Sequence, residues 1–277
     1  MSSLIAGIDF GASNTDVVVQ HPDGERRHWI LPSAGRPDET LVRRALAPGG
    51  IAAGDLAWIA VTGGDRRALP ATIDDRPLIG IDEVRAIGRG GCALAGVTRA
   101  LVTSAGSGTA VVAVDGDVAR HVTGTGVGGG TLVGLARLLC GTTDPRAIDT
   151  LAASGRDAVV NLTIEDVIGG AIGSLPADTT AVNFGRVARH AVDATPADMA
   201  AALVNLVGQV IGVVTINAAR AESMADAIVV GHLTDLPSVR RVLGLVGRYY
   251  GATLTIPDDA GQATALGALL VAAQPTP

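Results

Sequence analysis

Short apolar runs alternate along the chain with glycine-rich turns and with longer segments of helical spacing. The runs at residues 4–8 and 16–20 flank a turn of small and polar residues, which predicts a β-hairpin, and the runs at 100–103 and 110–114 predict a second one. Further strands are predicted at 29–31, 56–62, 227–230 and 252–256, and helices at 39–47, 82–95, 131–140, 145–154, 183–192, 197–222, 238–250 and 261–273.

The repetition of a hairpin followed by mixed helices and strands predicts two related halves facing a cleft. The boundary is expected near Gly96, which gives an N-terminal domain at 1–96 and a C-terminal domain at 97–277. Two unrelated hairpins would look alike at this level, so the internal similarity is weak evidence by itself.

The segment 197–222 carries few charges over more than twenty residues. Thr195 and Asp198 around Pro196 are typical of a capped helix start, and Asn205 and Gln209 interrupt the apolar run. We therefore expect a helix buried on most sides, partly between two subunits, and no membrane span.

Composition narrows the function. The chain has 277 residues, of which 48% are hydrophobic and 17% charged, and its net charge of −6 argues against nucleic-acid binding. All 21 basic residues are arginine, which excludes a P-loop lysine and a pyridoxal-phosphate lysine. The two cysteines, Cys92 and Cys140, form no metal motif, and the N-terminus lacks a signal-peptide pattern, so we expect a cytoplasmic protein.

Three turns have the composition of phosphate-binding loops, because small residues let backbone N–H groups approach an anion. They lie at 9–15, 104–109 and 124–131, and the third opens a helix. The candidate phosphate-binding residues are Gly11, Ala12, Ser13, Asn14, Thr15, Ser107, Gly108, Gly128, Gly129, Gly130 and Thr131. Asp9 ends a buried strand and is the candidate Mg²⁺ ligand, although a hairpin turn with a capping Asp is the simpler interpretation.

Two further patterns leave alternatives open. Residues 124–129 match the GxGxxG pattern, but no acidic residue ends a strand about twenty residues later, so a Rossmann site is the less favoured interpretation. Gly231 and His232 follow an apolar run and precede a helix, which is typical either of a purine or ribose pocket or of an ordinary turn.

The turns, in this order over both halves, resemble those of the superfamily of actin, sugar kinases and heat-shock ATPases. The segment 120–135, RHVTGTGVGGGTLVGL, is more specifically similar to the type II pantothenate kinases, and residues 61–64, 181–185 and 261–269 match in the same order. The resemblance implies an α/β, two-domain actin-like (ribonuclease H-like) fold with the nucleotide cleft between the domains. It also implies a homodimer that phosphorylates pantothenate with ATP and Mg²⁺.

The resemblance further implies residue roles. Glu83 matches the glutamate that takes the proton of the substrate hydroxyl, although a first-turn carboxylate also favours a helix dipole. Arg120 and His121 occupy the place of a substrate-binding arginine. Asp16 stands where the family has lysine, and strand alternation would allow it to point away from the cleft. The family's aromatic residues are replaced around residues 255 and 256.

These departures leave three alternatives to pantothenate phosphorylation. One is a related kinase with another hydroxyl acceptor. Another is a regulator that binds nucleotide or acyl-CoA without turnover. The last is an ATPase that activates another enzyme.

Overall fold

The computed structural model describes residues 3–274, and the strands in this range form two large mixed sheets and one small ribbon. The first large sheet has the order β3-β2-β1-β4-β6-β5. Its strands are β1 (Ile5–Phe10), β2 (Asn14–Gln20), β3 (Arg26–Pro32), β4 (Ile59–Gly63), β5 (Thr72–Ile73) and β6 (Arg76–Gly80). β1, β2 and β3 run antiparallel, whereas β4 and β6 continue the sheet in parallel with β1.

The second large sheet repeats this plan with the order β13-β12-β7-β8-β9. Its strands are β7 (Arg99–Ala105), β8 (Thr109–Asp115), β9 (Val118–Thr125), β12 (Ala227–Val230) and β13 (Leu254–Thr255). β7, β8 and β9 are antiparallel, and β12 and β13 extend the sheet in parallel with β7. Each half thus places an antiparallel hairpin beside parallel strands, as the repeated sequence pattern predicts.

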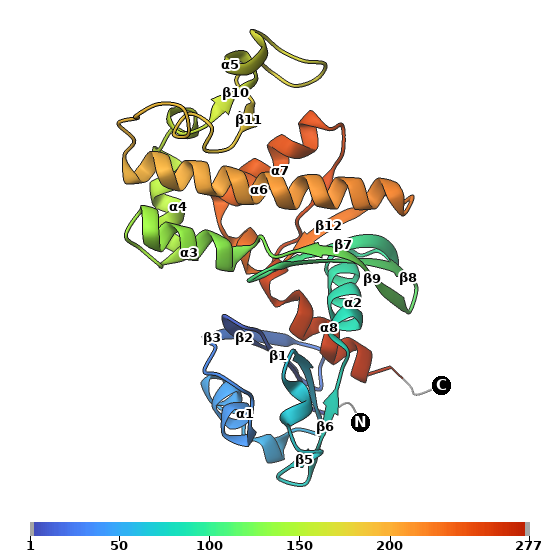
Figure 1. Ribbon diagram of the computed structural model, residues 1–277. Helices are drawn as coiled ribbons and strands as arrows, with labels where there is room; N and C mark the ends of the chain where they lie inside the picture. The colour runs from blue at the N-terminus through green and yellow to red at the C-terminus, as the bar shows by residue number, and fades with distance from the viewer. Residues whose placement is uncertain (1–2, 275–277) are drawn as a thin grey trace.

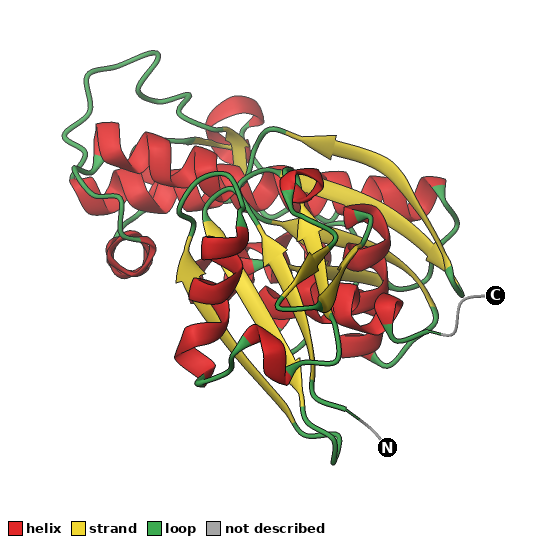
Figure 2. Cartoon of the chain, turned by 90° about the horizontal axis from the view of Figure 1, so that it is seen from below, coloured by secondary structure: helices red, strands yellow, loops and turns green. Residues whose placement is uncertain are grey.

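The helices lie outside and between the sheets (Figures 1 and 2). They are α1 (Glu39–Leu46), α2 (Glu83–Ala95), α3 (Gly129–Leu139), α4 (Pro145–Ser154), α5 (Ile164–Ile168), α6 (Pro196–Ala221), α7 (Pro237–Tyr249) and α8 (Ala263–Ala272). α2 packs on the second sheet through Ile87 and Cys92, and α8 packs on the first sheet through Leu266 and Leu269. α2 follows the strands of the first sheet in the chain but packs on the second sheet, and α8 follows the strands of the second sheet but packs on the first. The predicted division at residue 97 stays a prediction.

α2 and α8 cross very closely because each helix has a glycine at the crossing, Gly90 in α2 and Gly267 in α8. A Cβ added to Gly90 would overlap the carbonyl of Ala263, and one added to Gly267 would overlap that of Ala86. The two helices lie between the sheets in Figure 1 and join them at this crossing.

α6 is the long apolar helix expected from the sequence. Thr195 and Asp198 form a capping box at its start, with Pro196 in the first turn. Among the described residues it is the one helix long and apolar enough to cross a bilayer, a test that buried core helices also pass. Leu203, Val207 and Ile211 are fully buried in the core that α6 shares with α3, α4 and α7.

One predicted element is wrong. The segment 183–192 is not a helix but a series of turns that follows β11 (Thr180–Val182), which pairs with β10 (Leu162–Thr163). Asn161, which is fully buried, accepts a hydrogen bond from the N–H of Phe184 over 2.8 Å, so the chain is held by a side chain where a helix would use its own carbonyls.

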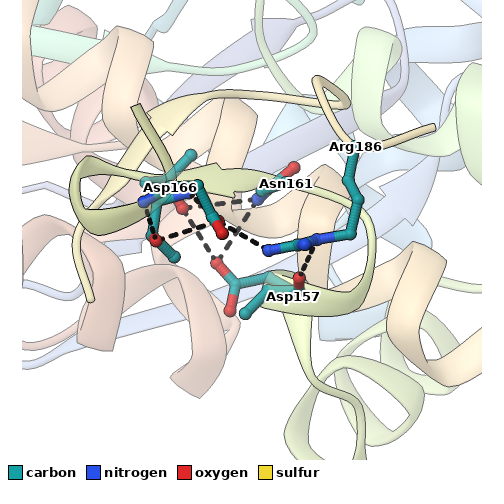
Figure 3. Close-up of polar contacts among 7 residues, drawn as sticks. Asp157, Asn161, Asp166 and Arg186 are labelled. Atoms are coloured by element: carbon teal, nitrogen blue, oxygen red, sulfur yellow. Dashed lines mark hydrogen bonds and ion pairs between the residues drawn. The ribbon is translucent and has the colours of Figure 1, made fainter. Parts of the chain in front are cut away.

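Polar side chains hold this segment together (Figure 3). Asp157 accepts hydrogen bonds from Asn161 and Thr180, and Arg186 pairs with Asp166 while donating to the carbonyl of Ala158. The polar residues of α6 complete the attachment, because Asn205 donates to Thr180 over 2.9 Å and Gln209 accepts from Asn183 over 2.9 Å. Asn205 and Gln209 thus attach the neighbouring segment to α6.

Candidate functional site

A cavity of about 800 Å³ lies between the two sheets, within the size range of small-molecule sites. Most of the residues predicted to bind nucleotide, metal or substrate line it. These are Asp9, Gly11, Ala12, Ser13, Asn14, Glu83, Ser107, Gly108, Gly129, Gly130, Gly231 and His232. The structure therefore brings together turns that are more than 200 residues apart in the chain.

The second and third turns are held to each other by their backbones. The N–H of Gly129 donates to the carbonyl of Gly106 over 2.8 Å, and the N–H of Gly130 donates to that of Ser107 over 2.9 Å. A Cβ on Gly128 would lie 2.8 Å from the backbone of Gly108. The first amides of α3 thus support the second turn, and glycine is required where the turns meet.

The remaining residues predicted for phosphate binding do not line the cavity. Thr15 is buried, and the hydroxyl of Thr131 donates to the carbonyl of Gly126 over 3.0 Å. Gly128 is the N-cap of α3. The structure gives Gly128 and Thr131 contacts within the turn, and a role for these three residues in phosphate binding stays a prediction.

The GxGxxG match does not lie in a Rossmann unit. Gly124 belongs to β9, an edge strand that is antiparallel to β8. The dinucleotide motif requires a parallel β-α-β unit at the start of its helix. The match is therefore part of the loop that leads from β9 into α3.

Asp9 and Asp16 form a pair of carboxylates at the edge of this cavity. Asp9 lies directly opposite Asp16 on the β1–β2 hairpin, so both face the same side of the sheet. Burial, followed by the negative charges of Asp16 and Glu83, raises the pKa of Asp9 to about 8. Its Oδ1 atom is buried and has no hydrogen-bond partner among residues 3–274. Asp16 does not point away from the cleft, contrary to the alternative that strand alternation allows.

His232 is the cation that faces these carboxylates. Its Nε2 lies 2.7 Å from Oδ1 of Asp16, and its Nδ1 lies 2.7 Å from Oδ2 of Asp235. Burial opposes protonation of the ring, but the hydrogen bonds to Asp16 and Asp235 outweigh it and raise the pKa of His232 to about 10. His232 begins η5 (His232–Asp235), which follows β12 directly. Sequence reasoning named His232 but gave no signal for its partner Asp16, 216 residues away.

Glu83 is the first residue of α2 and lines the cavity on its solvent-exposed side. Asp82 is the N-cap and accepts from the amides of Val84 and Arg85, so the helix start is satisfied without Glu83. The Glu83 carboxylate is therefore available to a molecule bound in the cavity.

Arg120 and His121 lie on opposite faces of β9. Arg120 pairs with Glu222 at the end of α6 over 2.6 Å, and neither Arg120 nor His121 lines the cavity. His121 lies opposite Val112, which packs in the core beneath α2. His121 is thus on the sheet side that carries Glu83, whereas Arg120 is on the α6 side. Their predicted roles in substrate binding stay predictions.

Several lining residues were missed by the sequence reasoning. Leu233, Leu236, Val133 and Pro145 form an apolar part of the cavity. Ser104 and Thr109, from the second predicted turn, and Thr125, from the third, also line the cavity; the sequence predicted these turns but did not single out the three residues. Leu233 could have been predicted because it follows Gly231 and His232 in the predicted turn. Pro145 could not, because it belongs to α4, in which the sequence analysis found no binding motif.

The charge of the lining is negative. Among the described residues, the lining contains Asp9, Asp16, Glu83 and His232 but no arginine. A polyanion in this cavity therefore needs a positive partner beyond the protein side chains. His232 is already shared between two carboxylates.

A sequence model of the Fumble family matches residues 97–250, more than half of the chain. The chain belongs to the Fumble family. The type II pantothenate kinase of Bacillus cereus (strain G9842) is 28% identical over 171 residues, which are 61% of this chain and 63% of the relative. That of Staphylococcus haemolyticus is 33% identical over 145 residues, 52% of this chain and 54% of the relative. This confirms the predicted family. The chain matches less than two thirds of the length of these relatives.

Solved structures bear out the fold of this Fumble-family chain. The activator of the 2-hydroxyisocaproyl-CoA dehydratase from Clostridium difficile, with bound ADPNP, has a TM-score of 0.66 at 16% identity and covers 97% of this chain and 94% of its own. A ROK-family glucokinase from Streptomyces griseus, in complex with glucose and AMPPNP, has a TM-score of 0.53 at 17% identity, with 97% and 99% covered. The predicted α/β, two-domain actin-like fold is therefore confirmed.

Proposed function

We propose that this protein is a kinase that transfers the γ-phosphoryl group of ATP to the hydroxyl of pantothenate. The observation that carries the proposal is the cavity itself, in which Asp9, the glycine turns and Glu83 converge between the two sheets. The named relatives, which are type II pantothenate kinases, support the choice of acceptor.

ATP would lie along the cavity with its purine against the apolar part around Leu233 and Leu236. Gly231 supports this arrangement because its φ of 97° and its contact with Ala105 leave no room for a side chain. The phosphates would lie at the turns that contain Ser13 and Ser107. Two of the similar solved structures hold an ATP analogue, ADPNP in one and AMPPNP in the other, which supports a nucleotide here.

Asp9 fits a Mg²⁺ ligand. Its Oδ1 is buried without a partner in the described part of the chain, and a carboxylate oxygen is a donor that Mg²⁺ prefers. The structure has no cluster of three or more His, Cys, Asp or Glu side chains suited to a metal within residues 3–274. Mg²⁺ commonly binds through one or two carboxylates together with phosphate oxygens, and Asp9 would be such a ligand. When bound, Mg²⁺ would supply the positive charge that the lining lacks.

Glu83 would act on the acceptor. Its carboxylate accepts the proton of the acceptor hydroxyl as the oxygen bonds to the γ-phosphorus and ADP leaves with the electrons of the broken P–O bond. Asp82 caps the helix, so Glu83 is free for this role.

We further propose that the protein is a homodimer formed through α6. Met199, Leu206, Val210, Val213 and Asn217 recur at helical spacing and are only half-buried or exposed, whereas the opposite side of α6 is fully buried. A second copy would cover this stripe.

The experiment is to measure ADP formation with and without pantothenate and to identify the product by mass spectrometry. Pantothenate-dependent ADP together with phosphopantothenate supports the proposal. Turnover with another hydroxyl compound alone indicates a different acceptor, and ADP formation that needs no acceptor indicates an activator ATPase. Nucleotide binding without turnover indicates a regulator.

A further inference from the structure

Three side chains connect the two walls of the cavity. Asp16 belongs to β2 of the first sheet, whereas His232 and Asp235 belong to η5 of the second half. Both ring nitrogens of His232 are engaged, Nε2 with Asp16 and Nδ1 with Asp235, each at 2.7 Å. An imidazole can donate from both nitrogens only when it is protonated, so the arrangement is that of a cation between two anions.

Gly261 packs closely against one edge of this arrangement. A Cβ on Gly261 would lie 2.5 Å from Cε1 and Nδ1 of His232 and 3.2 Å from Oδ2 of Asp235. Gly261 belongs to η6 (Ala260–Gln262), which leads into α8 on the first sheet. The ring is therefore held between elements of both halves.

A second contact joins the same walls nearby. The hydroxyl oxygens of Ser13 and Ser107 lie 2.7 Å apart, which links the first phosphate turn to the second. Ser13, Ser107, Asp16 and His232 all line the cavity. A ligand between the two walls thus lies beside the groups that hold them together.

We propose that Asp16, His232 and Asp235 form a strap that holds the cavity walls together and sets the rates at which nucleotide enters and leaves. The proposal rests on the proposed function only in taking the ligand to be a nucleotide. A ligand bound between the two walls contacts both of them, so its exchange is faster when the walls separate. Because charge-assisted hydrogen bonds are the stronger ones, breaking the strap is a cost of each opening. His232 and Asp235 are positioning residues in this account.

The test measures binding of fluorescently labelled ADP with Mg²⁺ by stopped flow, with no acceptor present. His232→Gln and Asp16→Asn should each raise both the association and the dissociation rate by about tenfold or more, as expected for loss of one charge-assisted bond. The double variant should change the rates no more than either single variant, since one strap is lost in each. Glu222→Gln is the control, because it breaks an ion pair of similar length within the second half.

A direct contact between His232 and the nucleotide would give a different result. In that case His232→Gln would raise only the dissociation rate, and Asp16→Asn would have the association and dissociation rates of the wild type. That outcome overturns the strap. If His232→Gln does not fold, Asp235→Asn removes one anion with the ring in place and should raise both rates in the same direction. Unchanged rates in that variant overturn the proposal as well.

Hydrogen exchange of the ligand-free protein separates the strap from the nucleotide proposal. Amides of η5 should exchange faster in His232→Gln than in the wild type, whereas those of β3, at the far edge of the first sheet, should not change. Equal exchange in both proteins overturns the strap. If ADP does not bind to the wild type, the nucleotide proposal fails and this comparison still decides the strap.

Discussion

Asp9 and Asp16 lie directly opposite each other on the β1–β2 hairpin, two carboxylates on one face at the edge of the cavity. Burial of Asp9, followed by the negative charges of Asp16 and Glu83, opposes ionisation of its carboxyl group and raises its pKa to about 8. Ionised Asp9 therefore lowers the stability of the folded protein when no cation is bound beside it. A bound cation would relieve it.

The first prediction follows from this cost. In the unfolded chain Asp9 ionises near its ordinary pKa of 3.8, whereas in the folded protein it ionises near 8, so Asp9 lowers stability progressively as pH rises between these values. Asp9→Asn should raise the melting temperature of the ligand-free protein at pH 8 by at least about 3 °C, with no gain near pH 4. The same variant should lower turnover about a hundredfold or more, because metal organisation contributes several kcal/mol. Differential scanning calorimetry and an ADP assay check both parts; a less stable but fully active variant would contradict them.

The second prediction concerns Glu83. Glu83→Gln should lower kcat by about 10²–10⁴-fold, the usual contribution of a general base, with little change in ADP affinity. Glu39→Gln is the matched control, since Glu39 is also the first residue of a helix with an Asp N-cap and lies outside the cavity. Equal, small effects of the two substitutions would mean that Glu83 serves only its helix.

The third prediction concerns the acceptor. His121 lies on the same sheet side as Glu83, and the cavity lining offers no arginine within the described residues. His121→Arg should lower KM for pantothenate by about tenfold, because a guanidinium forms charge-assisted hydrogen bonds with a carboxylate. His190→Arg, at an exposed position outside the cavity, is the control. No change in KM would indicate that the acceptor carboxylate does not lie near position 121.

The fourth prediction concerns His232 and pH. Its pKa is raised from 6.5 to about 10, so its stabilising contribution is complete below pH 6.5 and is lost as pH rises through 10. The charged groups that face it are Asp16, Asp235 and Asp9. Asp9→Asn should therefore be used as the background, to remove the titration of Asp9. In the Asp9→Asn variant the free energy of unfolding should fall between pH 7 and pH 10. Adding His232→Gln to this variant should abolish most of the fall. Parallel pH curves for the two proteins would show that the ring is not charged.

The fifth prediction concerns assembly. Val210→Asp places a charge in the middle of the half-buried stripe on α6 and should convert a dimer to a monomer at micromolar concentration, as measured by analytical ultracentrifugation. Asn217→Asp, on the same stripe but at an exposed and polar position, should have a smaller effect. A wild type that sediments as one chain would exclude the dimer.

The sequence predicted most of the elements, because their apolar periodicity is strong and their turns are rich in glycine. The helix at 145–154 agrees with α4 at both ends, and both hairpins form. The helix expected at 183–192 failed because Asn161, distant in sequence, holds that segment through the amide of Phe184. Local spacing carries no trace of such a contact.

The candidate site shows the same division. The glycine turns and Asp9 could be located because small residues next to a buried strand have a local signature. The side of β2 on which Asp16 lies depends on the register of the hairpin, and its pairing with His232 depends on how the two halves meet. Both features depend on tertiary structure and cannot be predicted from local patterns in one sequence.

The exchange of α2 and α8 between the sheets bears on how the chain is made. A ribosome releases β1, β2 and β4 early, but the helix that covers one face of these strands, α8, follows every other described helix and strand in the chain. Until then Ile5 and Val18 lack the cover of Leu266 and Leu269. The first sheet therefore keeps an apolar face exposed to solvent until α8 has been synthesised. Folding intermediates with exposed apolar surface are prone to aggregate. Chaperone dependence in the cell should accordingly concentrate in the N-terminal third of this protein.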